Sequence, residues 1–172
     1  MKGFCRPAAL AALAMALVGV LQTAAAADSP NATVVGTEPL LSDGARALQF
    51  REYEQGVRLT LEGLKLSVSR RERAAGLNNL CAGYAGLQRY DEALAACNEA
   101  LTLNIARWRV FNNRALALLG KKQVAAARRD VEAGLAINPD SRSLKKVLKL
   151  VEIAEISPKI TIAAVDSANP GR

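Results

Sequence analysis

The chain has 172 residues, of which 51% are hydrophobic and only 4% aromatic, and it carries 23 Lys and Arg residues against 16 Asp and Glu residues. It contains no histidine and three cysteines, which excludes Ser/His/Asp and Cys/His nucleophilic sites, haem held by a proximal His, and zinc held by His or by four thiolates. An enzyme would have to work with carboxylates, lysines or hydroxyls alone, and no convergent acidic pair is visible. We therefore expect a non-catalytic binding module with no cofactor and no metal.

Residues 1–27 are predicted to be a secretory signal peptide. Lys2 and Arg6 precede an uncharged run of 14 residues from Ala8 to Leu21, whereas a membrane-spanning helix needs about 20 apolar residues. Ala25, Ala26 and Ala27 supply a small-x-small cleavage pattern, so we expect a cut after Ala27. The mature protein is then expected in the periplasm or the secreted fraction, without stable membrane insertion; an uncleaved anchor is the alternative.

Residues 28–39 combine Ser, Pro, Asn and Gly without helical periodicity and are predicted to be a flexible leader. From residue 40 to 153 the pattern is helical, and residues 40–156 are predicted to form one domain. Small residues recur there in three groups with internal spacings of 12 and 7 residues, which predicts three antiparallel helix pairs with close backbones. The groups are Gly44, Gly56, Gly63; Cys81, Ala93, Ala100; and Ala115, Ala127, Gly134.

The second and third groups are offset by 34 residues, the period of the tetratricopeptide repeat. The segments NNLCAGYAGLQRYDEALAACNEALTLN (78–104) and FNNRALALLGKKQVAAARRDVEAGLAINP (111–139) resemble that family closely. The resemblance implies an all-α, right-handed helix-turn-helix solenoid with repeats at about 40–68, 74–107 and 108–141. The first repeat has Gly at all three small positions, so we expect it to be the least stable.

The apolar stripe of Leu144, Val147, Leu148 and Val151 predicts a C-terminal capping helix at 141–154. Pro158 ends any helix, and residues 157–172 are predicted to be a flexible tail. Its ITIAAV run (160–165) leaves three possibilities open, which are disorder, a strand for a partner, and docking in the protein's own groove.

The family resemblance further implies a concave face that is lined by the first helix of each repeat and binds an extended peptide. Asn78 and Asn79 recur 34 residues later as Asn112 and Asn113, and such a ladder of amides could hold a peptide backbone. The alternative is that these amides only tie neighbouring helices together. The residues expected in the groove are Asn78, Asn79, Arg109, Asn112, Asn113, Leu116 and Lys146. Relatives that clamp a C-terminal carboxylate have Lys and Asn where Leu41 and Ala45 stand here, so a complete clamp is not expected.

Residues 104–172 carry 13 basic and 6 acidic side chains, whereas residues 28–103 carry 8 and 10. If Arg109 and Lys146 face the groove, they favour an acidic segment of a protein or peptide partner. The alternative is that these basic side chains only form a solvated outer face. A nucleic-acid partner is not expected, because the chain carries an export signal and lacks interleaved aromatic residues. A homo-oligomer, formed through the exposed flank of the first repeat, is the second functional hypothesis.

Cys81 and Cys97 lie 16 residues apart on either side of a turn predicted near Gln88 and Arg89. This spacing places them at similar heights on antiparallel helices. A disulfide between them and a pair of buried free thiols both remain open.

Overall fold

The computed structural model describes residues 38–66, 68–105 and 107–156, and the regular secondary structure in this part of the chain is entirely α-helical. The helices are α1 (Pro39–Gln49), α2 (Tyr53–Leu64), α3 (Arg70–Gly86), α4 (Tyr90–Thr102), α5 (Arg107–Gly120), α6 (Val124–Ile137) and α7 (Arg142–Ile156). The all-α prediction is thereby confirmed. The predicted signal peptide, the leader before residue 38 and the tail lie outside the described residues.

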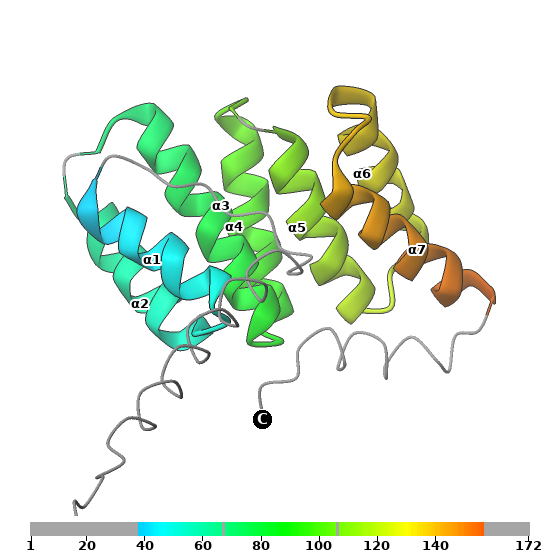
Figure 1. The fold of residues 1–172 in the computed structure, drawn as a ribbon, viewed down its shortest axis with the longest axis horizontal. Coiled ribbons are helices and arrows are strands. Elements are labelled where there is room, and N and C mark those ends of the chain that lie inside the picture. Colours follow the sequence, from blue (N-terminus) through cyan, green and yellow to red (C-terminus); the bar gives the residue numbers. More distant parts are fainter. Residues whose placement is uncertain (1–37, 67, 106, 157–172) are drawn as a thin grey trace, which may run out of the picture.

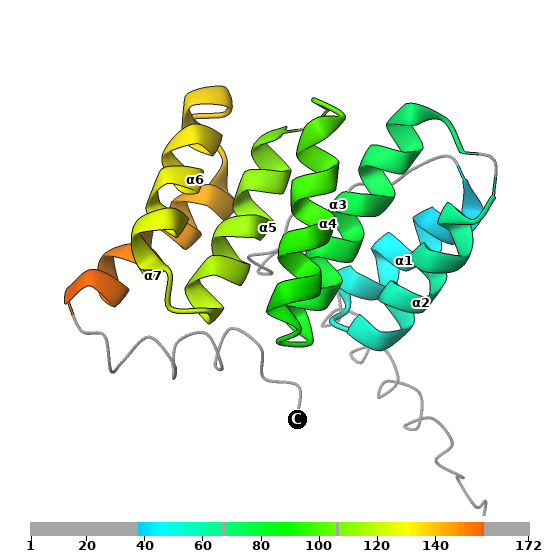
Figure 2. The same ribbon diagram turned by 180° about the vertical axis from the view of Figure 1, so that it is seen from behind.

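Each helix packs against the next one in the chain, and the odd-numbered helices α1, α3, α5 and α7 also pack against one another. Figures 1 and 2 show the three helical hairpins side by side, with α7 added at the C-terminal end. We call α1, α3, α5 and α7 the first helices. This arrangement is a helical repeat array, as the recurring small residues predicted.

Local sequence explains where the helices begin. Pro39 occupies the first turn of α1, where its missing N–H costs nothing, and the Glu38 carboxylate accepts a hydrogen bond from the Leu41 N–H at 2.7 Å. Ser69 and Glu72, which have the spacing of a capping box in the sequence, form that box at the start of α3. The capping helix, α7, begins one residue after the predicted start and runs two residues past the predicted end.

In each hairpin, a residue in the left-handed conformation stands two positions after the last residue of the first helix. None of these three residues is a glycine. Arg51, Gln88 and Lys122 have φ values of 64°, 59° and 61°. The N–H of the following residue in each case donates to a carbonyl five positions back, which is the pattern of a Schellman cap. Gly120 is the last residue of α5, but the left-handed residue of that turn is Lys122.

The nine small residues of the three groups are all buried, so the predicted close approach of paired helices is confirmed. Glycine is required where a tyrosine ring packs on the backbone. A Cβ on Gly86 would overlap the ring of Tyr53, and a Cβ on Gly120 would overlap the ring of Tyr90. The two contacts occupy equivalent places in successive repeats.

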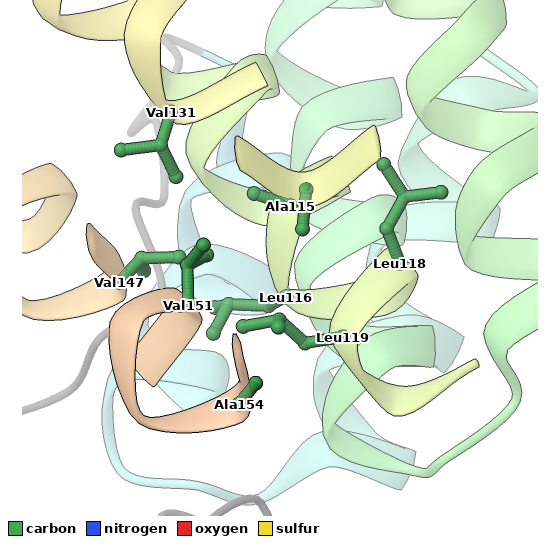
Figure 3. Packing of buried hydrophobic residues seen from close by; sticks show 9 residues of the cluster. Ala115, Leu116, Leu118, Leu119, Val131, Val147, Val151 and Ala154 are labelled. Atoms are coloured by element: carbon green, nitrogen blue, oxygen red, sulfur yellow. The ribbon is translucent and has the colours of Figure 1, made fainter. Parts of the chain in front are cut away.

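Buried hydrophobic side chains form two clusters. One joins α2, α3 and α4 to the start of α5, and the other joins α5, α6 and α7. Figure 3 shows the second cluster, in which Leu116 and Leu119 of α5 lie beside Val151 and Ala154 of α7. Among the described residues, no helix is both long and apolar enough to cross a membrane.

Candidate functional site

The four asparagines of the predicted ladder lie on two neighbouring first helices, α3 and α5, and the solvent-exposed fraction of each is 0%. The Asn113 side-chain amide donates to Asn78 Oδ1 at 3.1 Å, and the Asn112 amide donates to Asn113 Oδ1 at 3.1 Å. The first of these bonds links the two helices and joins residues 35 positions apart. None of the four amides is without a partner. A tie between neighbouring helices, the alternative left open by the sequence, is present; peptide binding by these amides stays a prediction.

Leu116 was expected to line the groove, but in the structure it is buried among hydrophobic side chains of α5, α6 and α7. The reason is that α7 packs against α5 and covers this position. Figure 3 shows Leu116 directed toward Val151 of α7. Leu116 therefore stabilises the capping helix.

Arg109 is half-buried at the start of α5, and its guanidinium carbon lies 4.3 Å from the centre of the Trp108 ring. Burial lowers the pKa of the guanidinium below its ordinary value. Lys146, on α7, is also half-buried and occupies the position 34 residues after Asn112. The two predicted cations thus lie on successive first helices, α5 and α7.

Cys81 on α3 and Cys97 on α4 are joined by a disulfide in the structure, with their Cα atoms 5.2 Å apart. Both residues are fully buried. The bridge links the two helices of the central hairpin, which also carries Asn78 and Asn79. It therefore holds the backbone that presents half of the amide row.

One polar network next to this site was not predicted from the sequence. Arg114 on α5 donates from Nε and Nη2 to the two carboxylate oxygens of Asp130 on α6, each at 2.7 Å, and from Nη1 to Asn98 Oδ1 on α4 at 2.8 Å. The hydrogen bond to Asp130 raises the pKa of Arg114. The 16-residue spacing between Arg114 and Asp130 was a signal for such a pairing, because it equals the Cys81–Cys97 spacing across a hairpin.

Within the described residues there is no group of three or more His, Cys, Asp or Glu side chains placed to hold a metal ion. The sequence matches no family model, and no curated protein or solved structure matches it either. The site must therefore be interpreted from its own geometry.

Proposed function

We propose that this protein is a non-catalytic adaptor whose array is a tetratricopeptide-type solenoid that holds an extended peptide segment of a partner along α3 and α5. The observation that carries the proposal is the row of four asparagine amides on these two adjacent first helices. These amides bond to one another within and between the two helices, and an amide side chain has both donors and an acceptor. An extended backbone offers donors and acceptors that match such a row.

The proposed partner segment is acidic. Arg109 and Lys146 lie on the first helices that follow the amide row, and the C-terminal half of the chain carries most of the excess positive charge. Positive charge beside a binding face accelerates the encounter with an acidic segment and makes binding sensitive to salt.

Burial of the amides has a kinetic consequence for this proposal. Because Asn78, Asn79, Asn112 and Asn113 have no exposed surface in the structure, a peptide reaches them only through a conformation in which this face is uncovered. The observed affinity is then reduced by the small population of that conformation. We expect the association rate to level off at high peptide concentration, at the rate of uncovering.

The test is fluorescence anisotropy of the full chain with an array of extended acidic peptides and their neutral counterparts. Asn79→Ala/Asn113→Ala is expected to weaken the tightest complex at least tenfold, while Asn98→Ala, which removes an exposed amide on α4, leaves it unchanged. Circular dichroism checks that each variant is folded. If both variants bind every peptide as the parent does, the asparagines are purely structural and the proposal fails.

A second candidate function is self-association through the first hairpin. Phe50 is 61% exposed and Leu61 is 40% exposed, so this hairpin presents two large apolar side chains to solvent. Sedimentation velocity over a range of concentrations tests it. A shift to a larger species that is abolished by Phe50→Ser/Leu61→Ser would support self-association, and a concentration-independent monomer would exclude it.

A further inference from the structure

Positive charge is concentrated at one end of the helices. The three connections between hairpins (65–73, 104–109 and 138–145) contain eight basic residues and two acidic ones, whereas the three turns within hairpins (49–55, 87–93 and 119–125) contain four of each. Figures 1 and 2 place the connections at one end of the helices and the turns at the other. We call the end formed by the connections the basic edge.

Apolar side chains project from the same edge. Leu66 follows α2 and is 51% exposed, and Ile137 ends α6 and is 48% exposed. Leu103, which follows α4 and is half-buried, occupies the equivalent place between them, 37 residues after Leu66 and 34 before Ile137. Each connection thus pairs an apolar residue with arginines that follow within a few positions.

Three arginines of this edge are available to a partner. Arg71, at the start of α3, and Arg142, at the start of α7, are exposed and form no ion pair with another described residue. Arg107 is also exposed, and its guanidinium carbon lies 5.5 Å from the centre of the Phe111 ring.

The acidic groups near these arginines are already engaged. Glu99, at the end of α4, accepts a bond from Arg73, and Asp140 pairs with Lys145. Glu72 accepts from Ser69 in the capping box. Glu38, at the start of α1, accepts from the backbone of its own helix. The acidic side chains thus leave Arg71, Arg107 and Arg142 unneutralised.

We propose that the basic edge adsorbs to an anionic phospholipid surface. Guanidinium groups bind phosphate oxygens in bidentate fashion, and exposed apolar side chains beside them enter the boundary between headgroups and acyl chains. The Trp108 ring, half-buried at this edge, is of the type enriched at membrane interfaces. A flat surface can contact all three connections at once, whereas an extended peptide segment would leave the spaced apolar tips uncovered. The adsorption is peripheral and uses a surface separate from the amide row.

The test is co-sedimentation of the full chain with vesicles of phosphatidylcholine, with and without a third of phosphatidylglycerol, at low and high salt. The apolar run 8–21 could bind either vesicle, so the readout is the difference between variants that share one N-terminus. Arg71→Gln/Arg142→Gln is the test variant. Arg129→Gln/Lys149→Gln is its matched control, because both residues are exposed, lie within α6 and α7 away from the connections, and form no ion pair with another described residue.

Each basic residue near an anionic surface strengthens binding about fivefold, so the test variant is expected to partition onto anionic vesicles at least tenfold less than the parent at low salt. The control variant should stay within about twofold, since charge away from the surface is screened. Leu66→Ser/Ile137→Ser should also reduce partitioning, and Phe50→Ser/Leu61→Ser should not. Equal losses in the test and control variants would overturn the proposal. Equal binding of the parent and the test variant to anionic vesicles would also overturn it. The same holds if the protein binds polyglutamate and does not bind vesicles.

Discussion

Arg114 is the central residue of a polar contact that joins three helices, and its partner Asp130 is almost completely buried. Replacing Arg114 with Met removes the counter-charge and leaves a buried carboxylate, which we expect to lower the free energy of unfolding by about 2–4 kcal/mol. Urea denaturation measures the loss. Arg46→Met, at an exposed pair with Asp43, is the control and should leave stability nearly unchanged. The account is contradicted if the two variants lose equal stability.

Substitutions at Gly120 and Lys122, which lie in the same turn, are expected to change the stability of the fold in opposite directions. Gly120→Ala gains helix propensity but places a Cβ against the Tyr90 ring, so we expect a net loss of about 1–3 kcal/mol. Lys122→Gly relieves a left-handed non-glycine residue and is expected to add about 0.5–1 kcal/mol. Thermal unfolding of both variants shows whether each substitution lowers or raises the melting temperature. A stabilising Gly120→Ala would mean that Tyr90 moves aside freely.

At the scale of elements, the disulfide fixes the α3–α4 hairpin. It closes a loop of 16 residues, which corresponds to about 3 kcal/mol in the chain-entropy description. We expect dithiothreitol to lower the urea midpoint of the parent, and Cys81→Ala/Cys97→Ala to show a low midpoint that no longer responds to the reductant. An unchanged parent midpoint under reduction, with both thiols shown to be free, would contradict this.

The capping helix α7 is tied to α6 by a pH-sensitive contact. Arg128 donates to both carboxylate oxygens of Glu155, and these hydrogen bonds lower the pKa of Glu155 from its ordinary value of 4.5. The contact therefore stabilises the fold fully above pH 4.5 and is lost as the pH falls through the lowered pKa.

We expect the melting temperature of Glu155→Gln to lie below that of the parent at neutral pH, and the gap to close as the pH falls below 4.5. Glu152→Gln, on the same helix and in no ion pair with another described residue, should show no such gap. A gap for Glu155→Gln that persists under acid conditions would show that the contact contributes through packing and not through charge.

At the scale of the whole molecule, the repeat architecture could be predicted from sequence because it rests on local spacing. The small residues of each repeat and the Ser69–Glu72 box depend only on neighbours along one or two helices. The position of Leu116 could not be predicted in this way, since it depends on how α7 lies across α5. Likewise, the 34-residue periodicity aligned Asn78 with Asn112 but did not predict the bond that joins Asn78 to Asn113. Side-chain direction between helices is a tertiary property that spacing alone does not specify.

The basic edge was also not predicted from the sequence. Net charge by halves of the sequence pointed to the C-terminal half, but the folded chain gathers Arg71 from the N-terminal half with Arg107 and Arg142 at one end of the helices. Residues that are about 35 positions apart become neighbours only after the hairpins stack. Counting charge by connection, and not by half, would have found this edge.

The proposed contact between an extended peptide and the asparagine row on α3 and α5 can be observed by NMR. The asparagine side-chain NH₂ groups of the full ¹⁵N-labelled chain are followed during titration with the tightest acidic peptide. We expect the signals of Asn78, Asn79, Asn112 and Asn113 to move or broaden with the peptide, while that of Asn98 on α4 stays in place. Saturated binding that shifts Asn98 and leaves these four signals unmoved would contradict it.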